Sequence, residues 1–408
     1  MREQTPLPYV GLDIGTSAVR CVIGLMDTSS GGKLSIVGHG SSSNIGMRKG
    51  VVVHVEDVVE AVAKAVSEAE RVSGVHVDAA TVNINGSHVT GLNSRGVIAI
   101  SAGNREITAE DRLRVEEAAT IVKLPPNREI VQVFAKNYRL DGQDNIKDPV
   151  GMQGVRLEVD THIVTASTPN VRNLDLVLER ARIAPMHHTV SSLAAAEAVL
   201  SRQQKEAGTV LIDIGAGTTN LVVLEDGEVQ HVAVIAVGGM HITNDLAIGL
   251  KTDLDIAESV KLEHANLVEI KKTKAGVTVN KQRHEFDPED VHMIVEARVE
   301  ELLELVDKEL KNIGKSRKLP GGVVLVGGTS KLPGIAAYTR EKLQLAARVG
   351  KLQPIGGLQD TVEDPSFYTA AGLMVLDMLL QPSANVPIGA RNDNIFGMVE
   401  GLFKRFRK

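Results

Sequence analysis

Two stretches of the chain, about 200 residues apart, have the residue types of a phosphate-binding loop. Residues 9–25 read YVGLDIGTSAVRCVIGL and residues 209–225 read TVLIDIGAGTTNLVVLE. In each stretch an apolar run ends in Asp-Ile-Gly, small residues follow, and a second β-rich run begins. Glycine lets backbone N–H groups approach phosphate oxygens, and hydroxyl side chains add donors. A single copy is also typical of an ordinary hairpin turn, but two copies favour a nucleotide site.

The aspartate at each strand end could hold Mg²⁺ through its bound waters. The candidate metal ligands are therefore Asp13 and Asp213. The candidate phosphate-binding residues are Gly15, Thr16 and Ser17 in the first loop and Gly215, Gly217, Thr218 and Thr219 in the second.

Further nucleotide-binding candidates follow the second loop. One glycine pair comes after the predicted strand HVAVIAV and opens a helix, and another comes after VVLV, where its backbone could pass under a base and ribose. Between them, a glutamate and a lysine at positions i and i+3 could reach the nucleotide from the side. Each feature alone is common, so the prediction rests on their order. In chain order these candidates are Gly238, Gly239, Glu258, Lys261, Gly327, Gly328, Thr329 and Ser330.

Length and composition limit the class of protein. The chain has 408 residues, enough for two or more domains, and its 43% hydrophobic and 24% charged residues are ordinary for a soluble protein. The net charge of −6 argues against a nucleic-acid-binding body. The single cysteine, Cys21, excludes an intramolecular disulfide, and its apolar surroundings predict burial. No signal peptide or membrane-spanning stretch is evident, so we expect the bulk of the chain in the cytosol.

The elements that position the loops form two related halves, because the repeat implies duplication within an α/β fold. We expect helices over 55–73, 253–270 and 287–313, and a helix from Thr108 with Asp111 in its first turn. The predicted segments are 1–80 (first half with loop one), 81–165 (an inserted α+β subdomain), 166–200 (return to the first half with a connecting helix), 201–230 (second half with loop two), 231–315 (a further subdomain of the second half), 316–380 (the last glycine motif and return to the first half), 381–394 (a linker) and 395–408 (a terminal helix).

The terminal segment IFGMVEGLFKRFRK is predicted to be an amphipathic helix. Its apolar side chains fall on one helical stripe beside a cluster of cations. A helix of 12 residues reaches only about 18 Å, too short to cross a bilayer, so it would lie in the headgroup plane of an anionic membrane. The alternative is docking on the chain's own core or on a partner. The membrane-contacting candidates are Ile395, Phe396, Val399, Leu402, Phe403, Lys404, Arg405 and Phe406.

The order of these motifs resembles that of the actin, hexokinase and DnaK-type chaperone superfamily, in which two RNase H-like halves close over ATP. Within it, GLDIGTSAVRCVIG, GSHVTGLNSRGVIAI, VRLEVDTHIVTAS, LIDIGAGTTNLVVL, AESVKLEHA and GVVLVGGTSKLPG are similar to the FtsA family of bacterial cell-division proteins. The resemblance covers nearly the whole chain. It implies an actin-like fold that binds ATP and Mg²⁺, with an inserted subdomain that contributes to filament contacts.

The resemblance also implies a function. We expect a peripheral protein that polymerises on the cytoplasmic face of the inner membrane at the division site and tethers the ring of the division tubulin FtsZ. The FtsZ C-terminal tail would dock near Arg298 and Glu301, on the helix 296–311. Other expected partners are further copies of the chain, anionic lipid and later division proteins, but not nucleic acid. A PilM-like pilus-assembly protein and a sugar-kinase-like enzyme of the same fold remain alternatives, and the terminal helix weighs against both.

The expected catalytic power is low. Chaperone-like relatives carry Glu-Pro-x-Ala-Ala-Ala between their phosphate loops, and the glutamate positions the attacking water. Here residues 191–196 read SSLAAA, and the serine that replaces the glutamate cannot act as a base near neutral pH. Glu197 is expected on the helix surface instead. Arg20 stands where some relatives have a phosphate-binding lysine, and it either contacts phosphate or faces solvent. We therefore expect ATP binding with at most slow hydrolysis and assign no catalytic residue.

Overall fold

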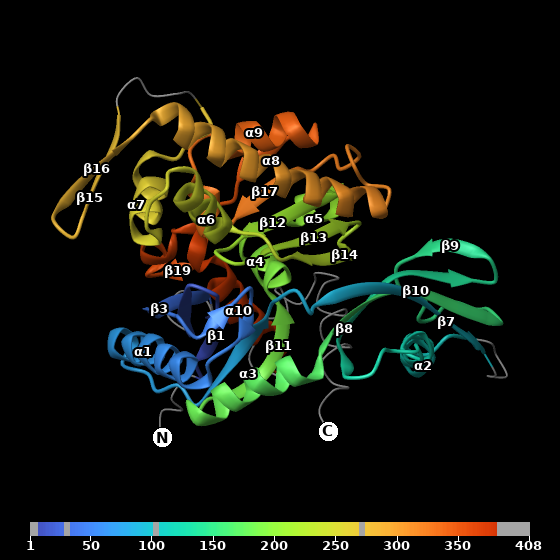
Figure 1. Ribbon diagram of the computed structural model, residues 1–408. Helices are drawn as coiled ribbons and strands as arrows, with labels where there is room; N and C mark the ends of the chain where they lie inside the picture. Colours follow the sequence, from blue (N-terminus) through green and yellow to red (C-terminus); the bar gives the residue numbers. More distant parts are fainter. Residues whose placement is uncertain (1–6, 28–32, 101–105, 269–273, 382–408) are drawn as a thin grey trace.

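The computed structural model describes residues 7–27, 33–100, 106–268 and 274–381. Its first half is built on a six-stranded sheet in the order β11-β6-β1-β2-β3-β19 (Figure 1). The strands are β1 (Tyr9–Ile14), β2 (Ala18–Asp27), β3 (Lys33–Ser43), β6 (Ala79–Ile84), β11 (Ala184–Val190) and β19 (Gly356–Gly357). β1, β2 and β3 form an antiparallel meander, and β6 is parallel to β1.

The second half repeats this connectivity. Its five-stranded sheet has the order β14-β13-β12-β17-β18. The strands are β12 (Thr209–Ile214), β13 (Thr219–Glu225), β14 (Glu228–Ile235), β17 (Gly322–Val326) and β18 (Ala347–Val349). β12, β13 and β14 again form an antiparallel meander, and β17 runs parallel to β12 as β6 does to β1. The two predicted loop sequences are the first hairpins of these meanders, so the prediction of two duplicated halves is confirmed.

Helices cover both sheets. The connecting and covering helices are α1 (Val55–Ser73), α3 (Thr168–Arg180), α4 (Ser191–Val199), α5 (Arg202–Ala207), α6 (Gly239–Gly249), α7 (Leu254–His264), α8 (Pro288–Asn312), α9 (Ile335–Leu343) and α10 (Tyr368–Leu380). α1 has the predicted bounds, and its apolar face is buried. α10 returns to the first half, where it packs against β1 and α4. Cys21 is fully buried, as its apolar surroundings predicted.

Several short elements complete the two halves. They are the strand pair β4 (Met47–Arg48) and β5 (Val51–Val52), the hairpin of β15 (Ala275–Val279) and β16 (Gln282–Phe286), and the 3₁₀ turns η1 (Gly328–Lys331), η2 (Gln359–Val362) and η3 (Pro365–Phe367). The β15–β16 hairpin projects from the second half beside α7 (Figure 1). The predicted β segment between α7 and α8 is this hairpin.

The inserted subdomain extends sideways from the first half (Figure 1). Its antiparallel sheet has the order β7-β10-β8-β9, and α2 covers one face. The elements are β7 (Thr90–Ala99), α2 (Ala109–Ala119), β8 (Arg128–Leu140), β9 (Gln143–Ile146) and β10 (Arg156–Ser167). α2 begins with the predicted capping box of Thr108 and Asp111. The predicted segment began at residue 81, whereas the strand Ala79–Ile84 pairs within the sheet of the first half.

The C-terminal predictions concern residues that the structure does not describe. The helix 395–408 and all but the first residue of the linker 381–394 lie outside the described ranges. Among the helices that are described, none combines the length and the apolar character needed to cross a membrane.

Candidate functional site

A cavity of about 760 Å³ lies between the two halves, and both hairpin loops open into it. Its walls come from β1, β2, β12 and β13, from α6 and α7, and from the segment that follows β17. The predicted residues that line it are Asp13, Gly15, Thr16, Ser17, Arg20, Asp213, Gly215, Thr218, Gly239, Glu258, Lys261, Gly327, Gly328 and Thr329. Tertiary structure thus brings together residues that span more than 300 positions of the sequence.

The two loops share one backbone geometry. In the first, the Gly15 N–H donates to the Ala18 carbonyl at 3.0 Å, and in the second the Gly215 N–H donates to the Thr218 carbonyl at 2.9 Å. The same turn therefore follows each Asp-Ile pair, as expected for a duplicated loop.

The loops also meet across the cavity. The Thr218 hydroxyl of the second half donates to Asn85 Oδ1 of the first half at 3.2 Å. A Cβ at Gly217 would lie only 2.8 Å from Thr16 Oγ1, so a larger residue there would push the loops apart. Loop two therefore lies against loop one, and we call this contact between the halves the closed arrangement.

The two aspartates at the strand ends are buried beside the cavity. Burial raises the pKa of Asp13 to about 7; the nearby Arg20 opposes the rise and Asp213 adds to it. Burial likewise raises the pKa of Asp213 to about 6, against the effects of the Thr369 hydroxyl and of Arg20. Asn83 Nδ2 donates to Asp13 Oδ1 at 2.7 Å. Two buried carboxylates whose charge is this poorly compensated suit a divalent cation.

Direct coordination by the protein is a poorer fit than coordination through water. No group of three or more His, Cys, Asp or Glu side chains in the described ranges is arranged to hold a metal ion. Mg²⁺ usually keeps several of its waters and binds through one or two carboxylates together with phosphate oxygens. Asp13 and Asp213 fit that mode.

Arg20 lies in the cavity wall and is partly buried. On β2 it is in register with Asp13, and its guanidinium lies 5.5 Å from the centre of the Phe367 ring. Its Nε is buried without a hydrogen-bond partner among the described residues. An unsatisfied, positively charged donor at this wall suits an anionic ligand.

Asn220 is a further cavity residue that the loop motif did not predict. It is paired with Asp213 as Arg20 is with Asp13, it lines the cavity, and its buried Oδ1 has no hydrogen-bond partner within the described structure. The repeat itself held the signal, because Arg20 and Asn220 follow their aspartates at the same spacing.

Glu258 and Lys261 form a connected group at the side of the cavity. Lys261 Nζ donates to Glu258 Oε2 at 2.6 Å and to Thr243 Oγ1 at 2.9 Å. It also donates to the Gly239 carbonyl at 3.3 Å, at the start of α6. The pair is therefore part of the cleft wall, with the Lys261 side chain 16% and the Glu258 side chain 42% exposed.

Four predicted residues do not line the cavity but support the loops that do. The Thr219 hydroxyl donates to the Val237 carbonyl at 2.8 Å, and the Ser330 hydroxyl donates to the Gly327 carbonyl at 2.7 Å. The remaining two are Gly217, in the contact between the loops, and Gly238, which precedes α6.

The serine that replaces the expected glutamate faces the cavity. Ser191 Oγ accepts a hydrogen bond of 3.1 Å from Asn83 Nδ2, the same nitrogen that bonds to Asp13. The expectation that Glu197 lies on the helix surface is wrong. Its side chain is only 9% exposed and accepts a 2.7 Å bond from Lys205 Nζ, whose side chain is 6% exposed. Lys205 lies on α5, which packs on β12 and β13, and Glu197 does not reach the cavity.

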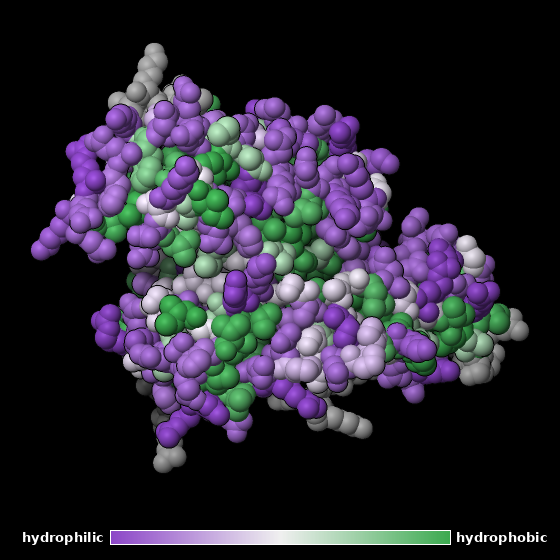
Figure 2. Space-filling view, in the orientation of Figure 1, coloured by the Kyte–Doolittle hydropathy of each residue, from purple (hydrophilic) through white to green (hydrophobic). Residues whose placement is uncertain are grey.

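The second half carries an exposed apolar face. Figure 2 shows apolar side chains gathered where α6, α7 and α8 meet the surface. The exposed members on these helices are Met240, Ile248, Leu254, Leu262 and Met293.

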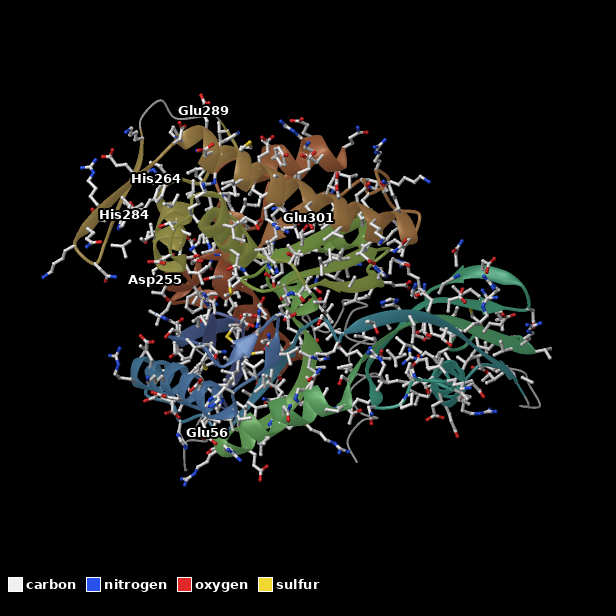
Figure 3. All side chains as sticks on the ribbon, in the orientation of Figure 1. Glu56, Asp255, His264, His284, Glu289 and Glu301 are labelled. Carbon is white, nitrogen blue, oxygen red and sulfur yellow. The ribbon has the colours of Figure 1, made fainter. Side chains whose placement is uncertain are left out.

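The two candidate partner residues lie on α8. Arg298 bonds to both carboxylate oxygens of Asp245 on α6 and donates from Nη1 to Glu301 Oε2 at 2.6 Å. Its side chain is 22% exposed, whereas that of Glu301 is 52% exposed, and Figure 3 shows Glu301 on α8. Arg298 thus ties two helices together, and Glu301 is the more accessible of the two.

Comparison with known families agrees with the sequence resemblance. Residues 210–372 match the family model described as "Cell division protein FtsA", and residues 86–165 match the "SHS2 domain inserted in FTSA". The chain is 40% identical over 371 residues to the cell division protein FtsA of Bacillus subtilis (strain 168), covering 90% of this chain and 82% of the relative. It is 35% identical over 378 residues to FtsA of Pseudomonas aeruginosa, covering 91% and 89%.

Solved structures share the fold at low sequence identity. The chain superposes on a structure described as a "PilM-PilN type IV pilus biogenesis complex" with a TM-score of 0.63 and 17% identity, covering 91% of this chain and 99% of the other. It superposes on the "MamK double helical filament" with a TM-score of 0.52 and 14% identity, covering 93% and 99%. The fold is therefore that of the actin-like ATPases.

Proposed function

Because the chain belongs to the FtsA family of cell division proteins and has the actin-like fold, we propose that it binds ATP with Mg²⁺ between its halves. The observation that carries this proposal is the pair of matching hairpin loops that face one cavity. Each loop follows a strand that has a buried aspartate near its end. A cavity of about 760 Å³ is large enough for a nucleotide.

Each part of the nucleotide has residues to hold it. The backbone of the two loops and the hydroxyls of Thr16 and Thr218 would bind phosphate oxygens. Asp13 and Asp213 would hold the waters of Mg²⁺, which would offset phosphate charge when bound. The Gly327-Gly328-Thr329 segment would lie against the adenosine, with Glu258 and Lys261 at its side.

The bound nucleotide would act as an assembly switch more than as a substrate. Ser191 occupies the wall where a general base would be needed, and the carboxylates that line the cavity are Asp13, Asp213, Glu258 and Glu263. The two aspartates would be committed to the metal, Glu258 is bonded to Lys261, and Glu263 lies on α7, outside the two phosphate loops. Slow or negligible hydrolysis follows, and turnover of many cycles per second by the purified protein would contradict it.

We propose further that the protein polymerises on the cytoplasmic face of the membrane and tethers FtsZ there. The support is family membership together with the apolar and basic stripe of residues 395–408. One such short helix binds weakly and reversibly, but a filament would bind through many helices at once. Assembly and membrane attachment would therefore be coupled.

The exposed face of α6 and α8 is the proposed docking site of the FtsZ tail. Glu301 lies on it, Ile248 and Met293 supply exposed apolar area, and Arg298 fixes α8 to α6 beneath it. Loss of tail-peptide binding in Arg298→Glu with ATP binding intact would support the site. Glu301→Lys is the cleaner variant, because it leaves the ion pair of Arg298 with Asp245 in place.

The decisive experiment is electron microscopy on lipid monolayers of anionic composition. We expect filaments with full-length protein and ATP, loss of filaments from the lipid surface when residues 395–408 are deleted, and recruitment of an FtsZ tail peptide only by the wild-type α8 surface. Filaments that cover the monolayer equally without ATP, or without the terminal residues, would contradict the proposal.

A further inference from the structure

The inserted subdomain is firmly attached to the first half at the roots of its strands. Arg128 Nη2 donates to the His88 carbonyl at 3.0 Å and to Thr165 Oγ1 at 2.7 Å, which joins β8 to β10 and to the segment before β7. Gln132, on β8, is buried, and its Nε2 donates to Thr189 Oγ1 at 2.8 Å. The Val190 N–H donates back to Gln132 Oε1 at 3.2 Å.

This attachment lies next to the nucleotide cavity. Val190 immediately precedes Ser191, which lines the cavity wall. Asn85, at the other root, also lines the cavity and accepts from Thr218 of the second half. The roots of the inserted sheet are thus linked directly to residues of the cavity wall.

The same sheet also docks on the second half. β14 is an edge strand of the five-stranded sheet, and it lies against β7, β8 and β10 (Figure 1). At this contact the backbone N–H of Val232 donates to Nε2 of the buried His162 at 3.0 Å. Because Nε2 accepts, the ring proton is on Nδ1, which donates to Asn93 Oδ1 at 2.9 Å. A Cβ at Gly91 would lie 2.4 Å from His162 Nε2, so glycine is required for this close approach.

Two neighbouring contacts extend the docking along β14. His231, on β14, lies with its ring centre 5.4 Å from that of His162, and its Nε2 is 3.1 Å from Glu309 Oε2 on α8. Beyond β9, Lys147 Nζ donates to the Asp226 carbonyl in the turn before β14 at 3.1 Å. The docking contacts therefore extend from the turn before β14 to the middle of the strand.

We propose that the inserted subdomain is a brace that holds the two halves in the closed arrangement, with His162 as the residue that fixes it to the second half. Its roots move with the first half, so a rotation that opens the cleft must break the His162–Val232 bond or slide β14 along the sheet. In the present structure this bond and the contact between the phosphate loops are formed together. Ligand binding between the halves and docking of the inserted subdomain on β14 therefore stabilise each other, as thermodynamic linkage requires.

Of the two tests of this proposal, the ATP titration depends on the proposed nucleotide site and the distance measurement does not. The first test needs no nucleotide: spin labels on Glu60→Cys of α1 and Glu304→Cys of α8, both exposed positions, report the distance between the halves by pulsed electron paramagnetic resonance. Cys21 is buried and burial raises the pKa of its thiol to about 12, so it will stay unlabelled.

The variants distinguish loss of the His162–Val232 hydrogen bond from a change in side-chain size. His162→Leu removes the acceptor, His162→Gln keeps an acceptor at the position of Nε2, and Lys147→Ala removes only the outer contact from an exposed position. Arg156→Ala is the matched control, because Arg156 lies at the far end of β10 and the ion pair that its side chain makes within the described ranges is with Glu158 of the same strand.

We expect the distance between labels to lengthen and broaden in His162→Leu, less so in Lys147→Ala, and to match the wild type in His162→Gln and Arg156→Ala. In the second test, ATP titration in Mg²⁺, His162→Leu should raise the Kd at least about fivefold, and His162→Gln should restore most of the loss. An unchanged label distance in both His162→Leu and Lys147→Ala would overturn the brace. Failure of the wild type to bind ATP would instead overturn the proposed nucleotide site and leave the distance test to decide the brace.

Discussion

Asp13 and Asp213 make the nucleotide-free protein sensitive to pH. Their pKa values in the folded state, about 7 and about 6, lie above the value near 4 of an aspartate in an unfolded chain. The folded protein therefore retains protons that the unfolded chain releases, so the free energy of unfolding falls as pH rises from about 4 to about 7. Mg²⁺ with ATP should remove this loss, because it compensates the carboxylate charges.

We predict that Asp13→Asn and Asp213→Asn each raise the melting temperature of the nucleotide-free protein at pH about 8. The free energy of unfolding should rise by on the order of 1 to 3 kcal/mol for each substitution, because a buried, poorly compensated charge is removed. The same variants should lose most Mg²⁺-dependent ATP affinity. Differential scanning fluorimetry across pH, with and without Mg-ATP, measures both effects. Variants whose melting temperature parallels that of the wild type from acid to neutral pH would contradict the argument.

Ser191 gives a test of why hydrolysis should be slow. Ser191→Glu places a carboxylate at the cavity wall beside Asn83 and Asp13, where a base could orient water. We predict that this change raises the rate of ATP hydrolysis at least about tenfold, since general-base catalysis commonly contributes about a hundredfold or more. Phosphate release measures the rate, and Ser191→Ala is the control. Equal rates in the two variants would mean that something other than a missing base limits turnover.

The helices α4 and α5 depend on one buried ion pair. Glu197 and Lys205 are almost completely buried, and each is the other's charge partner. Glu197→Gln would leave Lys205 charged and buried, so we predict a loss of about 3 kcal/mol in stability. The double variant Glu197→Gln with Lys205→Met should recover most of it. Urea denaturation of the single and double variants measures the difference, and a single variant as stable as the wild type would show that the pair is dispensable.

The elements that follow from local pattern were predicted well. The helix 55–73 has apolar residues at helical spacing along one face, and α2 starts at a recognisable capping box. The 3₁₀ turn η1, which comes between β17 and α9, was not predicted. Local sequence there shows a glycine pair, and a distant segment also contacts the start of the turn, because the Pro365 carbonyl accepts from the Gly327 N–H at 3.3 Å. A contact between distant segments cannot be read from either segment alone.

At the scale of the whole molecule, membrane attachment and assembly should be inseparable. Deleting residues 395–408 removes three of the six phenylalanines and four cations. We predict that the truncated protein no longer co-sediments with anionic vesicles, while its ATP affinity stays within about twofold of the full-length value. Vesicle sedimentation with and without ATP measures this, and neutral vesicles serve as the control. Undiminished sedimentation of the truncated protein would place the membrane contact elsewhere.

The sequence by itself determined the duplicated halves, the inserted subdomain and most of the cleft residues. It could do so because strand, glycine turn and strand are local patterns, and because two copies with equal spacing are improbable by chance. Tertiary structure alone decided the surroundings of individual side chains. Glu197 has a buried charge partner because Lys205 of α5 reaches it, Arg20 lines the cavity because its strand pairs with β1, and His162 meets Val232 because two sheets pack together. Burial and charge compensation depend on neighbours far away in the chain, so no local pattern contains them.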